Sequence, residues 1–270
     1  MKGMRLMFYL ALPLCLVSCA VPAQRDASGA RGARAAAGAA GALNLDALGR
    51  RIWQNECAGS TEGLVSWNSG EDFPSLGIGH FIWFPAGVQA PFDESFPRFV
   101  AYARQRGVQV PSFFLGDAPW ANKRAFLADR SGRADAMRRW LAGHVRLQTE
   151  FIVLRSREAL GRMMSCSSRP RDVQARYRAL AATTQGMYCL VDYVNFKGEG
   201  TKASERYLGQ GWGLLQVLEE MRGYPQGRAA TAEFSRAAAA VLRRRVQNAP
   251  ASRGESRWLQ GWLNRCATYR

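Results

Sequence analysis

Apolar residues recur at helical spacing along most of the chain beyond residue 42. At the start of this region Leu45, Leu48 and Ile52 share one helical stripe, and the same spacing leads next to Glu56. Helical spacing also dominates the later part of the chain and predicts a series of helices. Their expected ranges are 97–106, 119–129, 133–163, 171–182, 186–196, 204–222, 229–248 and 255–268.

A different pattern separates the first helix from the later ones. Residues 58–74 are rich in Gly, Ser, Asn and acidic side chains, and Leu76–Phe84 is typical of a strand or a hairpin arm. The chain from residue 43 onward contains no internal repeat and no further linker. We therefore expect a mainly α (α+β) domain over residues 43–270, with a small β-hairpin near its N-terminal end.

The first 42 residues have another composition. Two basic residues precede the apolar run Leu6–Val17, which is shorter than the about 20 residues that a membrane span needs. This pattern predicts a signal peptide over residues 1–19. Residues 20–42 are mostly Ala, Gly and Arg, which bury little surface and are typical of a flexible tether.

The end of the signal peptide resembles the lipobox of bacterial lipoproteins. It reads Leu-Val-Ser-Cys and ends at Cys19, with Ala20 after it. The resemblance implies that Cys19 is lipidated and becomes the mature N-terminus, and that the lipid anchors the protein in the outer membrane. We expect the domain to face the periplasm.

The charge of the chain is strongly basic. Lys and Arg number 37 against 21 Asp and Glu, giving a formal net charge of +16. Most of the basic residues are Arg, whose guanidinium pairs well with carboxylates and phosphates. Export argues against a nucleic-acid partner, whereas peptidoglycan carboxylates and anionic lipids are close at hand. A solvated Arg-rich surface explains the charge equally well.

Cysteine and histidine usage limits the possible chemistry. Beyond the signal peptide an even number of cysteines predicts two disulfides in an oxidising compartment, with three pairings open. These cysteines are Cys57, Cys166, Cys189 and Cys266. The sequence has no Cys-x-x-Cys spacing and only two histidines, so we expect no metal site and no cofactor. No nucleophile motif accompanies His80 or His144, and both histidines are expected to be structural.

Two features suggest a site for a sugar polymer. Glu56 falls on the apolar stripe of its helix, and burial of a carboxyl favours the neutral form that a general acid needs. Farther along, Gly77 and Gly79 leave one face of the predicted strand without side chains. That face has room for a bulky ligand such as a sugar ring, and a tight backbone bend explains the same glycines.

Three segments, in order along the chain, resemble the bacteriophage-type lysozymes. First, Glu56, a polar turn and Ser75-Leu-Gly-Ile-Gly-His80 look like their helix-ending glutamate and their Thr-Ile-Gly-Ile-Gly-His-like strand. Second, the segment from Cys189 to Gly200 looks like their Leu-Val-Ser-Phe-Ala-Phe-Asn-Val-Gly helix. Third, Gly-Trp-Leu-Asn-Arg-Cys, ending at Cys266, is similar to their Gly-Leu-Val-Asn-Arg-Arg. The resemblance implies a lysozyme-like fold.

The resemblance also implies catalytic roles. Glu56 takes the place of the general acid, and Glu71 is the preferred second carboxylate, with Asp72 and Glu62 as alternatives. Ser75 occupies the place of a hairpin Thr whose hydroxyl holds the attacking water. The sequence departs from the family in two ways: a cysteine follows Glu56 where the family has Gly, and the hairpin Asp has no unambiguous counterpart.

Further residues receive binding or structural roles from the same resemblance. Gly77, Gly79, Asn195 and Arg265 are the implied substrate-binding residues, with Arg265 approaching Glu56 from the last helix. That approach brings Cys57 near Cys266, which implies a Cys57–Cys266 disulfide and leaves Cys166–Cys189 as the second one.

The implied function is cleavage of the β-1,4 glycan strand of peptidoglycan or a related polysaccharide. Two other functions stay open. A segment beginning at Gly211 resembles the Gly-Leu-Met-Gln motif of lytic transglycosylases, which use a single glutamate. A glycan-binding envelope lipoprotein without catalytic activity is the other alternative, because a fold does not decide function.

Overall fold

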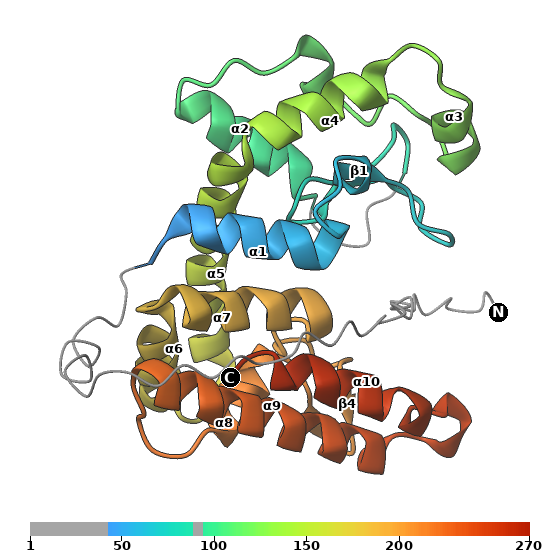
Figure 1. Ribbon diagram of the computed structural model, residues 1–270. Helices are drawn as coiled ribbons and strands as arrows, with labels where there is room; N and C mark the ends of the chain where they lie inside the picture. Colours follow the sequence, from blue (N-terminus) through green and yellow to red (C-terminus); the bar gives the residue numbers. More distant parts are fainter. Residues whose placement is uncertain (1–42, 89–93) are drawn as a thin grey trace, which may run out of the picture. The chain divides into compact units, whose positions relative to one another are not determined.

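The computed structural model describes residues 43–88 and 94–270. The predicted signal peptide, the tether and Cys19 lie outside the described residues. The described part is mainly helical, as the sequence predicts (Figure 1). Its helices are α1 (Leu45–Cys57), α2 (Phe96–Gln105), α3 (Lys123–Ala128), α4 (Arg133–Gly143), α5 (Val145–Cys166), α6 (Pro170–Ala181), α7 (Thr184–Lys197), α8 (Leu214–Glu220), α9 (Gly227–Asn248) and α10 (Ser256–Ala267).

Two small antiparallel sheets accompany the helices. The first has the order β1 (Val65–Ser66), β2 (Ser75–Leu76) and β3 (Phe81–Ile82), so the predicted hairpin gains a third strand. Leu76 pairs with both Val65 and Phe81 across this sheet. The second sheet pairs β4 (Arg206–Tyr207) with β5 (Gln210–Gly211).

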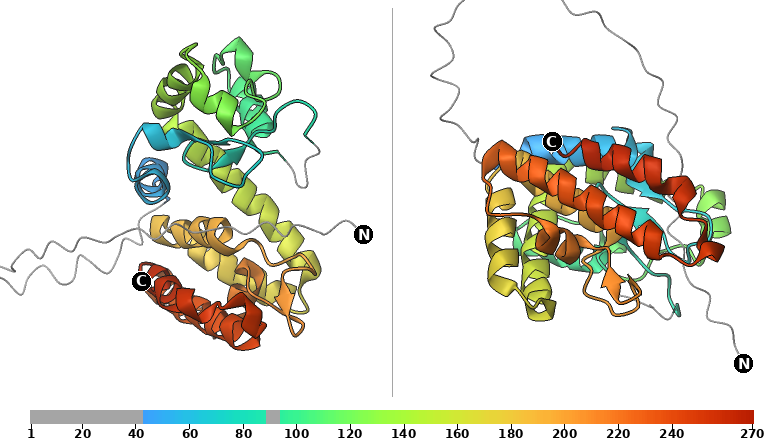
Figure 2. Two further views of the ribbon diagram at one scale, coloured as in Figure 1. Left: turned by 90° about the vertical axis from the view of Figure 1, so that its right-hand side faces the viewer. Right: turned by 90° about the horizontal axis from the view of Figure 1, so that it is seen from below.

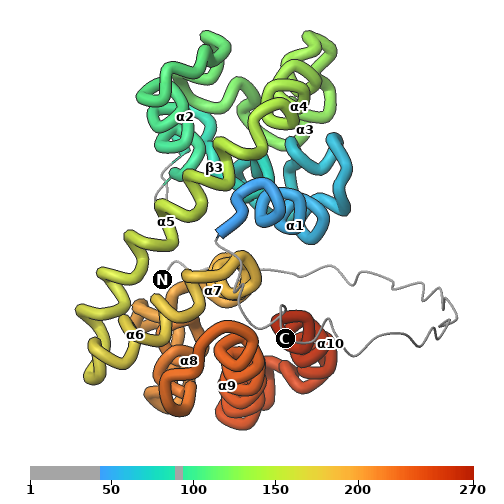
Figure 3. The backbone as a smooth tube through the Cα atoms, turned by 60° about the vertical axis from the view of Figure 1, so that its left-hand side comes forward, coloured from blue at the N-terminus to red at the C-terminus, as the bar shows by residue number. Residues whose placement is uncertain are grey.

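The long helix α5 connects two groups of elements. The first sheet and helices α2 to α4 surround its N-terminal end, and helices α6 to α9 gather around its C-terminal end (Figure 3). Helix α1 packs on α5 and α7, and α7 lies between α1 and α10 (Figures 1 and 2). Residues from both groups form one hydrophobic core. The C-terminal end of α1 is thereby brought close to the segment that leads into the first sheet.

Local sequence fixes the two ends of α1. The Asn44 side chain accepts a hydrogen bond from the backbone N–H of Ala47 at the start, as an N-cap residue does. Ala58 ends the helix in the left-handed conformation with φ of 51°. Leu48 and Ile52 are buried, so the apolar stripe faces the core as predicted. Glu56 consequently lies in the last turn, beside the sheet.

The prediction of one continuous helix over residues 133–163 is wrong. The structure has two helices there, α4 and α5, and the helical conformation is interrupted at His144. The Nδ1 of His144 lies 2.7 Å from the Trp140 carbonyl oxygen. The buried Gln148 side chain donates to the Leu141 carbonyl oxygen at 2.7 Å and accepts from the Ile78 N–H at 2.9 Å. Gln148 thus satisfies a carbonyl at the end of α4 and ties the strand segment to α5.

The predicted helix over residues 204–222 is also wrong in its first half. Leu208 and Gly209 have φ of 49° and 75°, and together they form the two-residue turn between β4 and β5. Positive φ at both central residues is the requirement of a tight hairpin turn. Helix α8 begins only at Leu214. No helix in the described part of the chain is both long and apolar enough to cross a membrane.

We expect Gly77→Ala to lower the free energy of unfolding by about 3 kcal/mol, because it combines left-handed strain with the loss of a buried hydrogen bond. The φ of Gly77 is +68°, and a Cβ at this residue would lie 2.2 Å from Gln148 Oε1. Urea unfolding of the variant and the wild type measures the change.

Gly70→Ala is the matched control. Gly70 also has positive φ, +86°, but no atom lies within 4 Å of the Cβ that it would gain. Its expected loss is about 1 kcal/mol from backbone strain alone. Equal losses of unfolding free energy in the two variants would show that the hydrogen bonds of Gln148 do not depend on a glycine at residue 77.

Candidate functional site

Glu56 meets two basic side chains at the end of α1. The side chain of Glu56 is 13% exposed, and its Oε1 accepts a hydrogen bond of 3.2 Å from the guanidinium of Arg265 on α10. Its Oε2 lies 3.5 Å from Nδ1 of His80. Arg265 therefore approaches Glu56 as the sequence resemblance implies, and His80 belongs to the same cluster.

Arg265 is held in place by the buried carboxylate of Asp192 on α7. Asp192 is 2% exposed and accepts hydrogen bonds from Arg265 Nε at 2.9 Å and from the Arg265 terminal nitrogen at 2.7 Å. Burial lowers the pKa of Arg265, but these hydrogen bonds and the charge of Asp192 outweigh burial and raise it. The paired geometry is the bidentate arrangement that favours Arg over Lys.

Two tyrosines complete the shell of Asp192. Tyr188 donates a hydrogen bond of 3.0 Å to one carboxylate oxygen, and Tyr269 donates one of 2.5 Å to the other. Burial, followed by the charge of Asp192, raises the pKa of both phenols, so they remain donors near neutral pH. Asn55, next to Glu56, donates in turn to the Tyr188 hydroxyl. The network therefore joins α1, α7 and the C-terminal end of the chain.

His80 lies in the connection between β2 and β3, in a strained backbone conformation. Its φ is 45°, a left-handed value that is uncommon for residues other than Gly, and its N–H bonds to the Gly77 carbonyl oxygen at 3.3 Å. Its side chain is 40% exposed. The connection directs the imidazole toward Glu56 and leaves part of it exposed to solvent.

Glu71 lies on the β1–β2 connection, in the same part of the molecule as His80. The indole of Trp67 donates to the Glu71 carbonyl oxygen at 2.8 Å, and Asn68 donates to its carboxylate at 3.1 Å. Burial raises the pKa of Glu71, although the Asn68 hydrogen bond and the charges of His80 and Lys123 partly oppose it. The half-buried Glu71 differs in this respect from Asp72 and Glu62, which are both exposed.

Other predicted site residues have different environments. Ser75 is 5% exposed and lies in the middle strand β2, whereas Asn195 is exposed on α7. The side of Gly77 without a side chain faces Gln148, and a Cβ on Gly79 would lie 2.5 Å from the Phe81 ring. The space left by these glycines is therefore filled by the protein itself, which corrects the expectation that it receives a ligand.

Neither predicted disulfide, Cys57–Cys266 or Cys166–Cys189, is formed: all four cysteines have free thiols. A Cβ on Gly63 would lie 2.8 Å from the Cys57 Cβ, so Cys57 packs under the turn that follows α1. Cys266 packs beside α9, where its carbonyl oxygen accepts from Ser235. Cys189 is buried in the core, whereas Cys166 is exposed at the end of α5. Burial raises the pKa of Cys57 and Cys266 to about 12, which keeps both thiols protonated.

Aromatic rings and cations extend the cluster along α7 and α10. The Arg265 guanidinium lies 4.7 Å from the centroid of the Phe196 ring. Lys197 lies 4.1 Å from the same centroid and 3.5 Å from that of Trp262. Burial, reinforced by the charge of Arg245, lowers the pKa of Lys197 to about 6. The amine is therefore mostly neutral at pH 7, unlike a surface lysine.

The low pKa of Lys197 predicts a specific pH dependence of stability. An unfolded lysine has a pKa of about 10.4, so between about pH 6 and that value the unfolded state binds a proton that the folded state does not. Unfolding free energy of the wild type should therefore rise with pH in this window, by up to about 1 kcal/mol per unit. Lys197→Met removes this contribution, so the stability of the variant relative to the wild type should fall from pH 6 to 9 in urea titrations.

Lys202→Met serves as the control for this measurement. The side chain of Lys202 is 66% exposed beside Glu205, and its removal should shift stability by a constant amount across the same pH range. A parallel response of the two lysine variants would show that Lys197 is charged in the folded protein.

Sequence reasoning missed the residues that hold the site together. Asp192, Tyr188 and Tyr269 carry no motif, and a polar residue on a helix gives no sign of its partners 70 or more positions away. Asp192 does lie in the segment that resembles a lysozyme helix, and it follows three apolar residues, which hints at burial. His80 ends the strand motif and was expected to be structural.

Comparisons with models of protein families, with curated proteins and with solved structures found no match.

The arrangement has the parts needed for acid–base chemistry. Glu56 lies beside the partly exposed imidazole of His80, and the charge of His80 also acts on the carboxyl group of Glu71, which comes from a different element. Asp192 accepts two hydrogen bonds from Arg265, and its negative charge offsets much of the guanidinium charge. The electrostatic effect of Arg265 on Glu56 is therefore smaller than that of an unpaired arginine. Proton transfer between a carboxyl group and a bound polar substrate is the chemistry that this set of groups supports.

Proposed function

We propose that the protein cleaves β-1,4 glycosidic bonds of peptidoglycan, as a lysozyme-like glycoside hydrolase. The observation that supports this most strongly is the position of Glu56, which lies 3.5 Å from His80 and accepts a hydrogen bond from Arg265. Glycoside hydrolysis generally uses two carboxyl groups, one on each side of the scissile bond. The resemblance of three sequence segments to phage-type lysozymes supports the same reaction, and Arg265 lies beside Glu56 as that resemblance implies.

Each carboxyl group then has a separate role. Glu56 donates its proton to the leaving glycosidic oxygen, and Glu71 accepts a proton from the attacking water. The raised pKa of Glu71 suits this role, because it makes the carboxylate a stronger base. His80 and Arg265 orient Glu56, and the partly exposed face of the cluster admits the polymer.

We expect Glu56→Gln and Glu71→Gln each to reduce glycan cleavage at least about 100-fold, since general acid–base catalysis contributes factors of this order. The full chain and its variants are incubated with purified peptidoglycan, and the released fragments are identified by mass spectrometry. Reducing-end muropeptides from the wild type are the expected product.

Glu158→Gln is the matched control, because Glu158 is an exposed glutamate on α5 that has no part in the proposed reaction. Its activity should equal that of the wild type. Anhydro products that require Glu56 but not Glu71 would replace hydrolysis by the single-glutamate transglycosylase reaction. Sedimentation with peptidoglycan without any fragment release would indicate a glycan-binding protein and would overturn the proposed reaction.

We propose further that a lipid on Cys19 anchors the protein in the outer membrane, facing the periplasm. The lipobox-like sequence before Cys19 supports this location, and the adjoining wall is the proposed substrate. In cells, Cys19→Ser should move the protein from the membrane fraction to the soluble fraction and remove the lipid mass from its N-terminal peptide. An unchanged distribution and peptide mass would show that Cys19 carries no anchor.

A further inference from the structure

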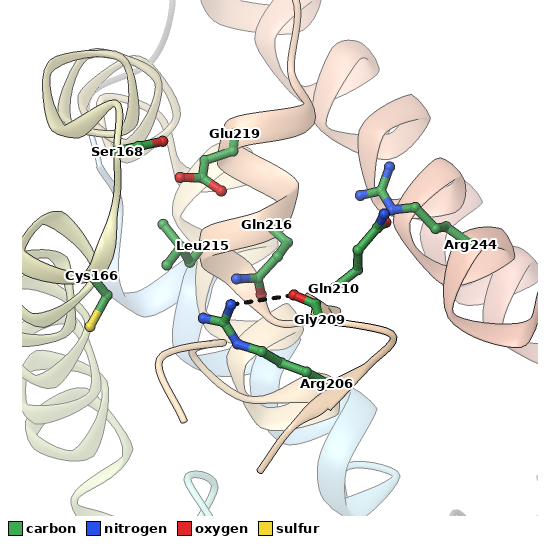
Figure 4. Close-up of a pocket in the computed structure, with 10 residues that line it drawn as sticks. Cys166, Ser168, Arg206, Gly209, Gln210, Leu215, Gln216, Glu219 and Arg244 are labelled. Carbon is green, nitrogen blue, oxygen red and sulfur yellow. Dashed lines mark hydrogen bonds between the residues drawn. The ribbon is translucent and has the colours of Figure 1, made fainter. Parts of the chain in front are cut away.

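A cavity of about 360 Å³ lies between the end of α5, the β4–β5 hairpin, α8 and α9, and none of the candidate catalytic residues lines it. The residues that line it include Cys166, Arg206, Leu215, Glu219 and Arg244. In Figure 4 the Arg206 guanidinium and the Glu219 carboxylate lie on either side of Leu215, and Cys166 lies beside them. The cavity thus carries charges of both signs around an apolar side chain.

The two opposite charges do not neutralise each other. Neither Arg206 nor Glu219 forms an ion pair within 4.0 Å with any side chain in the described part of the chain, although both line one cavity. Arg206 donates only one long hydrogen bond, 3.4 Å, to the Gly209 carbonyl oxygen. One oxygen of Glu219 accepts a hydrogen bond from Ser167 at 2.6 Å. Most of the hydrogen-bonding capacity of both groups is therefore available to a ligand.

A third group adds to the positive side of the cavity. Arg244 is paired with Glu220 through one terminal nitrogen at 3.0 Å, but its buried Nε has no hydrogen-bond partner among the described residues. Gln216, in contrast, uses both ends of its side-chain amide within the protein: it accepts from the Gly213 N–H and donates to the Gly200 carbonyl oxygen. The charged residues of the cavity thus keep hydrogen-bonding groups that no described residue satisfies.

These features define the chemistry of a suitable ligand. A molecule with a single charge would satisfy one wall and leave the opposite charge unpaired, which carries a desolvation cost. A molecule with a free ammonium and a free carboxylate satisfies both walls at once. We propose that this cavity is a binding site for a zwitterionic amino acid or short peptide, with its ammonium on Glu219 and its carboxylate on Arg206.

This site is independent of the proposed glycan cleavage, because the two share no residue. One residue that lines the cavity can report whether a ligand is bound. Cys166 is exposed and lines the cavity, whereas Cys57, Cys189 and Cys266 are buried. A maleimide should therefore label Cys166 selectively among these four, and a ligand in the cavity should block the reaction.

The experiment measures maleimide labelling of Cys166 in the full chain by peptide mapping. Alanine and the dipeptide Ala-Ala are the zwitterionic probes; N-acetyl-Ala-Ala keeps only the carboxylate, and Ala-Ala amide keeps only the ammonium. Labelling should slow about threefold when the better zwitterion is present at about twice its dissociation constant, because only free sites react. Each capped dipeptide should bind about tenfold more weakly, the usual effect of losing one charge-assisted hydrogen bond.

Charge-removing variants test each wall separately. Arg206→Gln and Glu219→Gln should each raise the dissociation constant of the better zwitterion about tenfold, while Arg228→Gln, at an exposed arginine of α9, should leave it unchanged. Folding of each variant is checked by circular dichroism, and Ala-Ala amide should still bind Arg206→Gln as it binds the wild type. Failure of both zwitterions to protect Cys166, or equal protection by the capped dipeptides, would overturn the proposal.

Discussion

The buried carboxylate of Asp192 is the constraint on which the candidate site depends. It accepts four hydrogen bonds, two from Arg265 and one each from Tyr188 and Tyr269. An isolated carboxylate in this environment would be strongly destabilised, so the donors on α7, α10 and the C-terminal turn must all be in place. Only then can the terminal nitrogen of Arg265 that bonds to Asp192 also donate to Glu56. Formation of the site is thereby coupled to the packing of helices that are far apart in sequence.

The first sheet provides the second half of the site through its backbone. Gln148 at the start of α5 fixes the Ile78 N–H, and the turn that follows places His80 at a left-handed φ. Because the same side chain of Gln148 also binds the end of α4, the helix break at His144 and the position of the strand segment are linked. The β1–β2 connection carries Glu71, whose pKa is influenced by the charge of His80. Two separate networks, around Asp192 and around Gln148, meet at Glu56 and His80.

Local patterns predicted the local features of this molecule. The apolar stripe of α1 predicted this helix and the position of Glu56 on it, and helical spacing located α6, α7, α9 and α10 within a few residues. The errors occur where a nonlocal contact or a turn decides the local structure. The Gln148 side chain bonds to the end of α4 where one continuous helix was predicted, and the turn at Leu208 and Gly209 replaces part of another predicted helix. The ligand space inferred from Gly77 and Gly79 was wrong because side chains distant in sequence, such as Gln148, fill it. Even numbers of cysteines likewise say nothing about where each thiol packs, and Asp192 is recognisable as a central residue only once Arg265 lies against it.

A crystal structure of the Glu56→Gln variant with a bound N-acetylglucosamine tetramer tests the central claim most directly, because the substitution preserves the shape of the side chain while slowing cleavage. If Asp192 and Arg265 position residue 56 for glycan cleavage, a glycosidic oxygen will lie within hydrogen-bonding distance of the side-chain amide introduced at that position. The Glu71 carboxylate will then face the sugar from the other side of the scissile bond, and the Arg265–Asp192 pair will be unchanged. A tetramer bound away from His80, or a Glu71 carboxylate turned away from the bound sugar, would contradict the claim.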